Sequence, residues 1–239
     1  MTEPTPAFPR GTILGYPRIG RRRELKRAVE AHWSGATDEQ TLEATAAELR
    51  RATRERLAAL GLGRANSSIP ESFSYYDQVH DAAVAVGVLP ERFADLREAD
   101  GSIGIGAYFT AARGAGEHLP LEMTKWFDTN YHYLVPEIGP ETAFSLSSDR
   151  LARHVAEAKA DGFTVRPVLV GPVTLLALAK ATDSAQEAAD EAGFDPLSRL
   201  DDLLPVYAEL LAGLRAAGAE WVQLDEPALV SEALPSTPA

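Results

Sequence analysis

The chain has 239 residues, of which 45% are hydrophobic and 24% charged, and 35 acidic residues against 23 lysines and arginines give it a net charge of −12. This length and apolar content can bury a substantial core, and the negative charge argues against nucleic acid as a general partner. The sequence contains no cysteine, which excludes disulfides, thiolate nucleophiles and sulfur-ligated zinc within these residues.

Two further features concern location. The opening MTEPTPAFPRGT is polar and rich in proline, without the apolar region of a signal peptide. The longest apolar stretch, residues 168–179, is too short to span a bilayer. We therefore expect a soluble, cytoplasmic protein with no membrane partner.

Five short strand-like runs alternate with helical patterns along the chain, which predicts parallel β/α units. The runs cover residues 12–17, 72–77, 127–137, 165–172 and 220–227. Apolar residues at helical spacing predict amphipathic helices over 42–60 and 200–214. Gly162 and Gly218 stand just before a predicted strand, where the glycine that ends a helix is favoured.

The end of each run carries polar, glycine or proline residues, which would gather at the carboxyl edge of a parallel sheet. The predicted fold class is α/β, with a (β/α) barrel of the TIM type as the preferred architecture. Such a barrel needs eight strands, and about five of the eight units are recognisable. We expect an incomplete barrel over residues 12–230, with a flexible tail at 1–11 and another at 231–239, where a longer protein is truncated.

The stretch GYPRIGRRRELK, residues 15–26, concentrates five cationic side chains around Glu24 in an otherwise acidic chain. Two interpretations are open. RRRELKR is either a solvated helix face, with Glu24 paired to Arg27 at i, i+3, or the start of a helix whose free N–H groups and basic side chains bind an anion.

The phrase DTNYHY brings together Asp128, Asn130 and His132. These residue types suit either a metal or acid–base site, or a histidine that is simply hydrogen-bonded. No other residues supply metal ligands at a recognisable spacing, so we predict no metal site in this chain.

Two phrases follow predicted strands near the C-terminal part of the chain. Asp225 and Glu226 are either an acid–base pair, ligands for a polar ring, or structural caps at the next turn. Gly171 and Pro172 either open an anion-binding helix or form a tight strand-to-helix turn.

Five long phrases, taken in order, resemble the amino-terminal domain of the cobalamin-independent methionine synthase family over nearly all of residues 12–230. They are GYPRIGRRRELKRAVEAHWSG, SFSYYDQV, PLEMTKWFDTNYHYLVPE, RPVLVGPVTLL and EWVQLDEPAL. The resemblance implies an enzyme of two β/α barrels that uses no cobalamin. Its carboxyl-terminal barrel carries zinc on Cys, His and Glu ligands and binds homocysteine, and that barrel is absent from this chain.

The resemblance also implies a function, namely transfer of a methyl group from 5-methyltetrahydropteroyltri-L-glutamate to L-homocysteine, giving methionine. In this picture the present part binds the folate polyglutamate, holds no catalytic residue and is inactive alone. The γ-linked glutamates present several carboxylates, which fixed cations bind well. The residues that match the family's folate-binding positions are Arg22, Arg23, Glu24, Leu25, Lys26 and Lys125.

Two other hypotheses remain open at this point. The chain is alternatively a complete, non-catalytic binding module for a polyanionic small molecule or an acidic partner. It is also compatible with a different methyl-group enzyme that has a related barrel.

Overall fold

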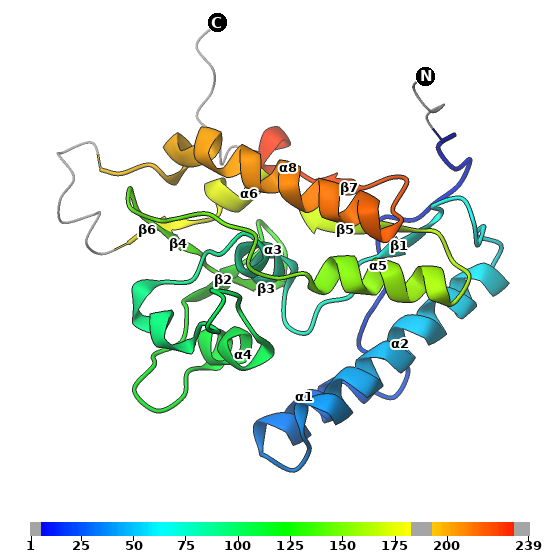
Figure 1. Ribbon diagram of the computed structural model, residues 1–239, viewed down its shortest axis with the longest axis horizontal. Helices are drawn as coiled ribbons and strands as arrows, with labels where there is room; N and C mark the ends of the chain where they lie inside the picture. Colours follow the sequence, from blue (N-terminus) through cyan, green and yellow to red (C-terminus); the bar gives the residue numbers. More distant parts are fainter. Residues whose placement is uncertain (1–5, 183–192, 232–239) are drawn as a thin grey trace, which may run out of the picture. The chain divides into compact units, whose positions relative to one another are not determined.

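The computed structural model describes residues 6–182 and 193–231, which divide into two compact units (Figure 1). The first unit holds the described residues up to Tyr75 together with Arg150–Val168 and Ala212–Gln223. The second holds Tyr76–Asp149, the described part of 169–211 and the described residues from Leu224.

The first unit is built around the long helix α2 (Glu39–Ala59), which the sequence predicted over 42–60. The Asp38 side chain caps it by accepting a hydrogen bond of 2.8 Å from the Thr41 N–H. Helix α1 (Glu24–Trp33) packs against α2, and the buried apolar residues of the two helices close this contact. Helix α5 (Arg150–Ala160) also belongs to this unit.

A three-stranded sheet has the order β1-β5-β7, formed by β1 (Ile69–Glu71), β5 (Val165–Val170) and β7 (Gln223–Asp225). Strands β1 and β5 are parallel, with Ile69 opposite Val165. All six residues of β5 are buried, as expected of a central strand. The runs at 165–172 and 220–227 are thus confirmed as strands, and so is the helix predicted over 200–214, which is α8 (Leu200–Ala217).

The second unit is assembled from short elements. Its core includes Phe93, Ala111, Ala112, Leu121 and Leu134. Strands β4 and β6 pair in parallel, whereas β2 and β3 are antiparallel. The elements are α3 (Gln78–Ala85), η1 (Glu91–Leu96), α4 (Ile105–Arg113), β2 (Met123–Lys125), β3 (His132–Leu134), β4 (Glu137–Ile138), α6 (Pro172–Ala177), β6 (Lys180–Ala181), η2 (Pro196–Arg199) and η3 (Pro227–Val230).

The strand predicted over 12–17 is wrong, because this segment has no ladder partner. Side chains hold it instead. The Thr12 hydroxyl donates to the Ser68 carbonyl at 2.7 Å, and the Arg166 guanidinium donates to the Ile13 carbonyl at 2.8 Å. The Gln223 side-chain amide donates to the Leu14 carbonyl at 3.2 Å. Side chains thus satisfy the Ile13 and Leu14 carbonyls without a regular strand.

The strand predicted over 72–77 is displaced along the chain. Strand β1 ends at Glu71, and Phe73–Tyr76 run through a turn. Asp77 then caps α3, since its side chain accepts the His80 N–H at 2.8 Å. The polar residues that the run carried are therefore on a loop and at a helix start.

The single strand predicted over 127–137 is also wrong, since this segment contains a hairpin turn and two separate strands. Phe127 has a positive φ of 47°, and the Trp126 N–H donates to the Tyr131 carbonyl at 2.8 Å. The turn reverses the chain, so that β3 pairs antiparallel with β2, Lys125 lying opposite His132. The DTNYHY phrase therefore forms a hairpin and not the end of a parallel strand.

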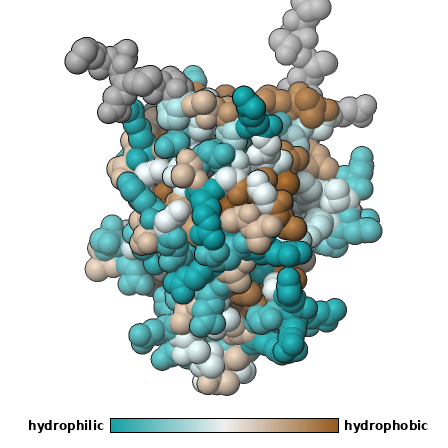
Figure 2. Space-filling model, turned by 90° about the vertical axis from the view of Figure 1, so that its right-hand side faces the viewer, coloured by the Kyte–Doolittle hydropathy of each residue, from teal (hydrophilic) through white to brown (hydrophobic). Residues whose placement is uncertain are grey.

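The strands within 6–182 and 193–231 form sheets of three, two and two strands, without a closed barrel. The structure thus supports a mixed α/β fold with parallel pairings. The face in Figure 2 is largely hydrophilic or intermediate in colour, with strongly hydrophobic residues gathered near the top and centre of the view. Among the helices of the described residues, none combines the length and apolarity needed to cross a membrane.

Candidate functional site

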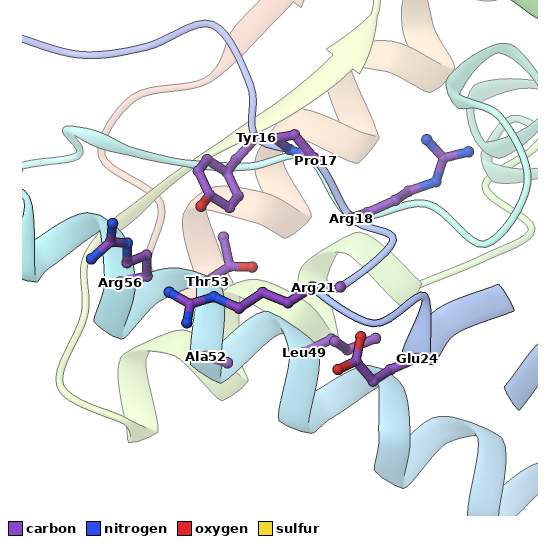
Figure 3. Close-up of a pocket in the computed structure, with 10 residues that line it drawn as sticks. Tyr16, Pro17, Arg18, Arg21, Glu24, Leu49, Ala52, Thr53 and Arg56 are labelled. Carbon is purple, nitrogen blue, oxygen red and sulfur yellow. The ribbon is translucent and has the colours of Figure 1, made fainter. Parts of the chain in front are cut away.

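A cavity of about 320 Å³ lies in the first unit, between the segment that precedes α1 and one face of α2 (Figure 3). Its wall combines apolar, hydroxyl and basic side chains. A volume near 300 Å³ is at the lower end for small-molecule sites. The lining residues are Tyr16, Pro17, Arg18, Gly20, Arg21, Glu24, Leu49, Ala52, Thr53 and Arg56.

The turn before α1 shapes this cavity. Gly20 has a φ of +81°, which favours glycine, and Arg23 closes the turn with a φ of 61°. The Leu25 N–H donates to the Ile19 carbonyl at 3.2 Å. The Glu24 carboxylate accepts the Arg22 N–H at 2.9 Å, and a Cβ at Gly20 would overlap that carboxylate. The glycine thus lets residues 16–21 fold back toward α2.

Glu24 stays ionised in this turn. The backbone N–H of Arg22 is the main reason that the pKa of the Glu24 carboxyl lies below its ordinary value. The charges of Arg27 and Arg22 act in the same direction. The Glu24 carboxylate therefore binds an N–H group at the start of α1, as acidic residues in a first helical turn often do.

Two guanidinium groups and the Tyr16 hydroxyl face a common space in the cavity. Figure 3 shows the Arg21 side chain running past Thr53 toward Arg56, with the Tyr16 hydroxyl directed to the same region. The Arg18 side chain extends away from them in that view. An arrangement of cationic and hydroxyl donors suits a carboxylate or another oxyanion.

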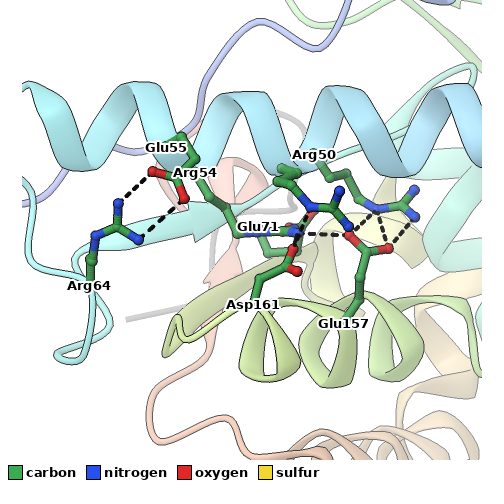
Figure 4. A network of polar contacts seen from close by, with 8 residues as sticks. Arg50, Arg54, Glu55, Arg64, Glu71, Glu157 and Asp161 are labelled. Atoms are coloured by element: carbon green, nitrogen blue, oxygen red, sulfur yellow. Dashed lines mark hydrogen bonds and ion pairs between the residues drawn. The ribbon is translucent and has the colours of Figure 1, made fainter.

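The inner face of α2 presents two other arginines to a buried network (Figure 4). Arg54, 1% exposed, donates to Glu157 on α5 at 2.8 Å and to Asp161, which directly follows α5, at 2.6 Å. Arg50 also pairs with Glu157, and Arg54 lies 3.5 Å from the fully buried Glu71. These arginines link α2 to α5 and β1, and their charges are already balanced by carboxylates.

The sequence-predicted cationic residues lie beside the cavity and not in its lining. Arg22, Arg23 and Lys26 are exposed, while the Leu25 side chain is buried at 2% exposure. Lys26 pairs with Glu30 at 3.5 Å, and only Glu24 of this group lines the cavity.

The other predicted residues of the EMTKWFDTNYHY region belong to the second unit. Lys125 on β2 and His132 on β3 are exposed and lie opposite each other in the hairpin. Asp128 and Asn130 are exposed on the connecting turn. The structure thus brings these four residues together on one hairpin.

The Glu226 side chain makes no capping hydrogen bond at the turn that follows it and contacts the start of α6 instead. Its carboxylate accepts the N–H groups of Val173 at 3.1 Å and Thr174 at 2.7 Å, at the start of α6. The Gly171 N–H donates to the Asp225 carbonyl at 2.9 Å. The GPVT helix start is therefore covered by the protein's own carboxylate, and Glu226 acts as a cap.

Sequence reasoning missed Arg21, Thr53 and Arg56 as lining residues. The local signal was weak, because an arginine on an amphipathic helix is ordinary. Arg50, Arg54 and Arg56 all lack an acidic residue three or four positions away, so local spacing does not distinguish Arg56 from the two arginines that pair with α5. Only the folded turn before α1 brings Arg21 to the same cavity.

Asp77 was also missed as a titrating group. Burial raises the pKa of its carboxyl to about 7, although the N–H groups of His80 and Leu134 favour the ionised form. The His80 N–H lies at 2.8 Å and the Leu134 N–H at 3.1 Å. Its sequence signal was the helix-capping position before α3.

The residues that the structure describes do not fit the zinc ion that the sequence resemblance implies for the family. Among them, no three or more His, Cys, Asp or Glu side chains are grouped to hold a metal ion, and the whole sequence lacks cysteine. Structural and catalytic zinc sites need at least three such ligands.

Comparisons with known proteins agree on one family. The family model described as "Cobalamin-independent synthase, N-terminal domain" matches residues 10–238. The 5-methyltetrahydropteroyltriglutamate–homocysteine methyltransferase of Streptomyces griseus subsp. griseus is 55% identical over 234 residues, which cover 98% of this chain and 29% of that protein.

Two further relatives carry the same name. The one from Mycobacterium tuberculosis strain H37Rv is 51% identical over 241 residues, covering 100% of this chain and 30% of the relative. The one from Streptomyces coelicolor is 53% identical over 230 residues, covering 96% and 28%. The chain spans less than a third of the length of these curated relatives. It belongs to the N-terminal domain family of the cobalamin-independent methionine synthases.

Proposed function

We propose that this chain is the folate-binding part of a methyltransferase that transfers the methyl group of 5-methyltetrahydropteroyltri-L-glutamate to L-homocysteine and so forms methionine. We propose also that its sheets are part of a (β/α) barrel of the TIM type within residues 12–230. Membership of the family and the names of the relatives support the first statement, and the parallel pairing of β1 with β5 and of β4 with β6 supports the second. The observation that carries the binding role is the cationic segment at residues 15–26 in a chain of net charge −12.

The exposed side chains of Arg22, Arg23 and Lys26 bind the carboxylates of the glutamate tail. They lie at the N-terminal end of α1, whose dipole adds to the attraction for anions. The Glu24 carboxylate holds the turn through the Arg22 N–H, and the buried Leu25 anchors the helix. These two residues thus position the cations and do not themselves meet the tail.

Lys125 is the candidate of the second unit. Its ammonium group is exposed on β2, and the hairpin turn that follows carries Asp128 and Asn130. Together with His132 they provide donors and acceptors for polar atoms of the substrate. Glu226 is assigned no substrate contact, because its carboxylate accepts the N–H groups at the start of α6.

The tail carboxylates are remote from N5, where the bond to the methyl group breaks as the carbon–sulfur bond forms. Binding residues that contact only the tail therefore act on substrate capture more than on the chemical step.

The test is a kinetic comparison in the full-length protein of Arg22→Ala, Arg23→Ala, Lys26→Ala and Lys125→Ala, with triglutamate and monoglutamate methyltetrahydrofolate. Charge-assisted hydrogen bonds are worth roughly 1.5 to 3 kcal/mol, so each change should lower kcat/KM for the triglutamate by about tenfold to a hundredfold. The loss should be in KM, smaller for the monoglutamate, and reduced at high salt.

Arg215→Ala is the matched control, because Arg215 is an exposed arginine on α8, outside the cationic segment. Values near those of the wild type for all four variants with both folates would refute the binding role. Tight binding of the triglutamate without any methionine formation would favour a binding module instead.

A further inference from the structure

Two arginines in the α1–α2 cavity have no acidic partner within residues 6–182 and 193–231. Neither the Arg21 nor the Arg56 guanidinium makes an ion pair or side-chain hydrogen bond there, and both line the cavity. Glu24 is the one carboxylate in the lining, and it accepts the N–H of Arg22. Two like charges that share a cavity repel each other unless an anion lies between them.

The other arginines of α2 each have an acidic partner, which makes the lack of one at Arg56 informative. Arg50 and Arg54 pair with Glu157, and Arg51 lies 3.2 Å from Asp161. The fold thus supplies a carboxylate to every arginine of this helix except Arg56. In a chain with a large excess of acidic residues, an unpaired pair of arginines in a cavity indicates a site for an external anion.

The other residues that line the cavity indicate which class of ligand it would bind. The Tyr16 hydroxyl is directed to the same region as the two guanidinium groups, and Thr53 lies beside the Arg21 side chain (Figure 3). Leu49, Ala52 and Pro17 add apolar wall. A ligand with carboxylates on a short aliphatic chain would match cations, hydroxyl donors and apolar surface together.

We infer that this cavity binds the terminal glutamate of the folate's γ-linked tail, with Arg21 and Arg56 on its carboxylates. This inference rests on the proposed function and deepens it, because it assigns selection for tail length to residues outside the RRRELK segment. The cations of α1 bind the earlier part of the tail. Arg56 therefore acts only on substrates long enough to reach the cavity.

The test measures equilibrium binding of methyltetrahydrofolate with one and with three glutamates to the full-length protein, by calorimetry without homocysteine. Arg56→Gln and Arg21→Gln should each weaken the triglutamate complex by about tenfold or more. Both should leave the monoglutamate affinity unchanged. Arg56→Lys should recover part of the loss, since it keeps the charge but not the bidentate geometry.

Arg215→Gln serves as the control for removal of one exposed positive charge. The assignment of the cavity is overturned if the wild type prefers the triglutamate but each variant loses the same affinity for both folates, or loses affinity for neither. If the wild type itself binds both folates equally or not at all, the proposed function fails, and this inference fails with it.

Discussion

At the scale of single residues, the buried carboxyl of Asp77 is the clearest source of pH dependence. Burial raises its pKa from 3.8 to about 7. Between these values the folded chain holds a proton that the unfolded chain has lost. The free energy of unfolding should therefore fall as the pH rises through this window, by up to about 1.4 kcal/mol per pH unit, and then level off.

Asp77→Asn should remove this contribution. Chemical denaturation of wild type and variant at several pH values between 4 and 8 measures it as the change in their difference. Asp38→Asn is the control, because hydrogen bonds from Thr41 lower the pKa of Asp38 below 3.8, so its contribution is lost only below the pH range of this experiment and its difference from the wild type should stay constant. A constant difference between wild type and Asp77→Asn would contradict the assignment.

Arg54 is the residue on which the buried network depends most. Burial raises the pKa of Glu71, and the charges of Arg50 and Arg54 oppose this rise. Removing Arg54 takes away the guanidinium that lies 3.5 Å from Glu71 and leaves only the charge of Arg50 to oppose the effect of burial. Breaking such a buried pair from one side costs about 3 to 5 kcal/mol, so we expect Arg54→Met to lower the free energy of unfolding by that amount.

Arg51→Met is the matched control, because Arg51 pairs with the same Asp161 from an exposed position. Exposed ion pairs contribute about 0 to 1 kcal/mol. Denaturant titration of both variants compares them directly. A loss for Arg54→Met no greater than that for Arg51→Met would show that the network contributes little to stability.

At the scale of elements, α6 depends on a carboxylate from a distant part of the chain. Glu226 satisfies two N–H groups at its start, and the Ala228 N–H in turn donates to the Thr174 hydroxyl at 3.2 Å. These contacts join the segment after β7 to the start of α6. Helix starts need such acceptors because their first N–H groups have no partner within the helix.

Glu226→Ala should therefore cost about 1 to 2 kcal/mol, the usual range for losing a helix cap. It should also speed hydrogen exchange at the Val173 and Thr174 amides. Glu220→Ala, at an exposed position before β7, is the control and should change neither. Unchanged exchange at both amides in Glu226→Ala would show that Glu226 does not cap this helix.

At the scale of the whole molecule, unpaired sheet edges are the feature most expected to cause association between chains. Strands β1 and β7 lie at the two edges of the three-stranded sheet formed by the described residues. Unpaired edges favour association with other chains, and a barrel removes them by closure.

Purified residues 1–239 should therefore associate with increasing concentration, which sedimentation velocity measures. A stable monomer would contradict this expectation if it also melted in a sharp two-state transition and had protected amides in β1, β5 and β7.

Local pattern determined α2, α8 and β5. Helical spacing of leucines and a continuous apolar run are properties of neighbouring residues, so they can be read without the fold. The order and wording of the five phrases likewise identified the family, which the match over residues 10–238 confirms. The cationic segment and a helix that starts within it were also predicted from the sequence. In the structure this helix begins at Glu24.

Some segments and sites depend on hydrogen-bond and ion-pair partners that lie far away in the sequence, and only the tertiary structure determined these. Residues 12–14 are held by Arg166 and Gln223, more than 150 positions away, and no local pattern reports such bonds. The cavity likewise exists only because the turn at Gly20 brings Arg21 to α2 near Arg56. Hydrogen bonding and charge balance act through space, so the sequence shows which residues are present, and only the fold shows which of them remain without a partner.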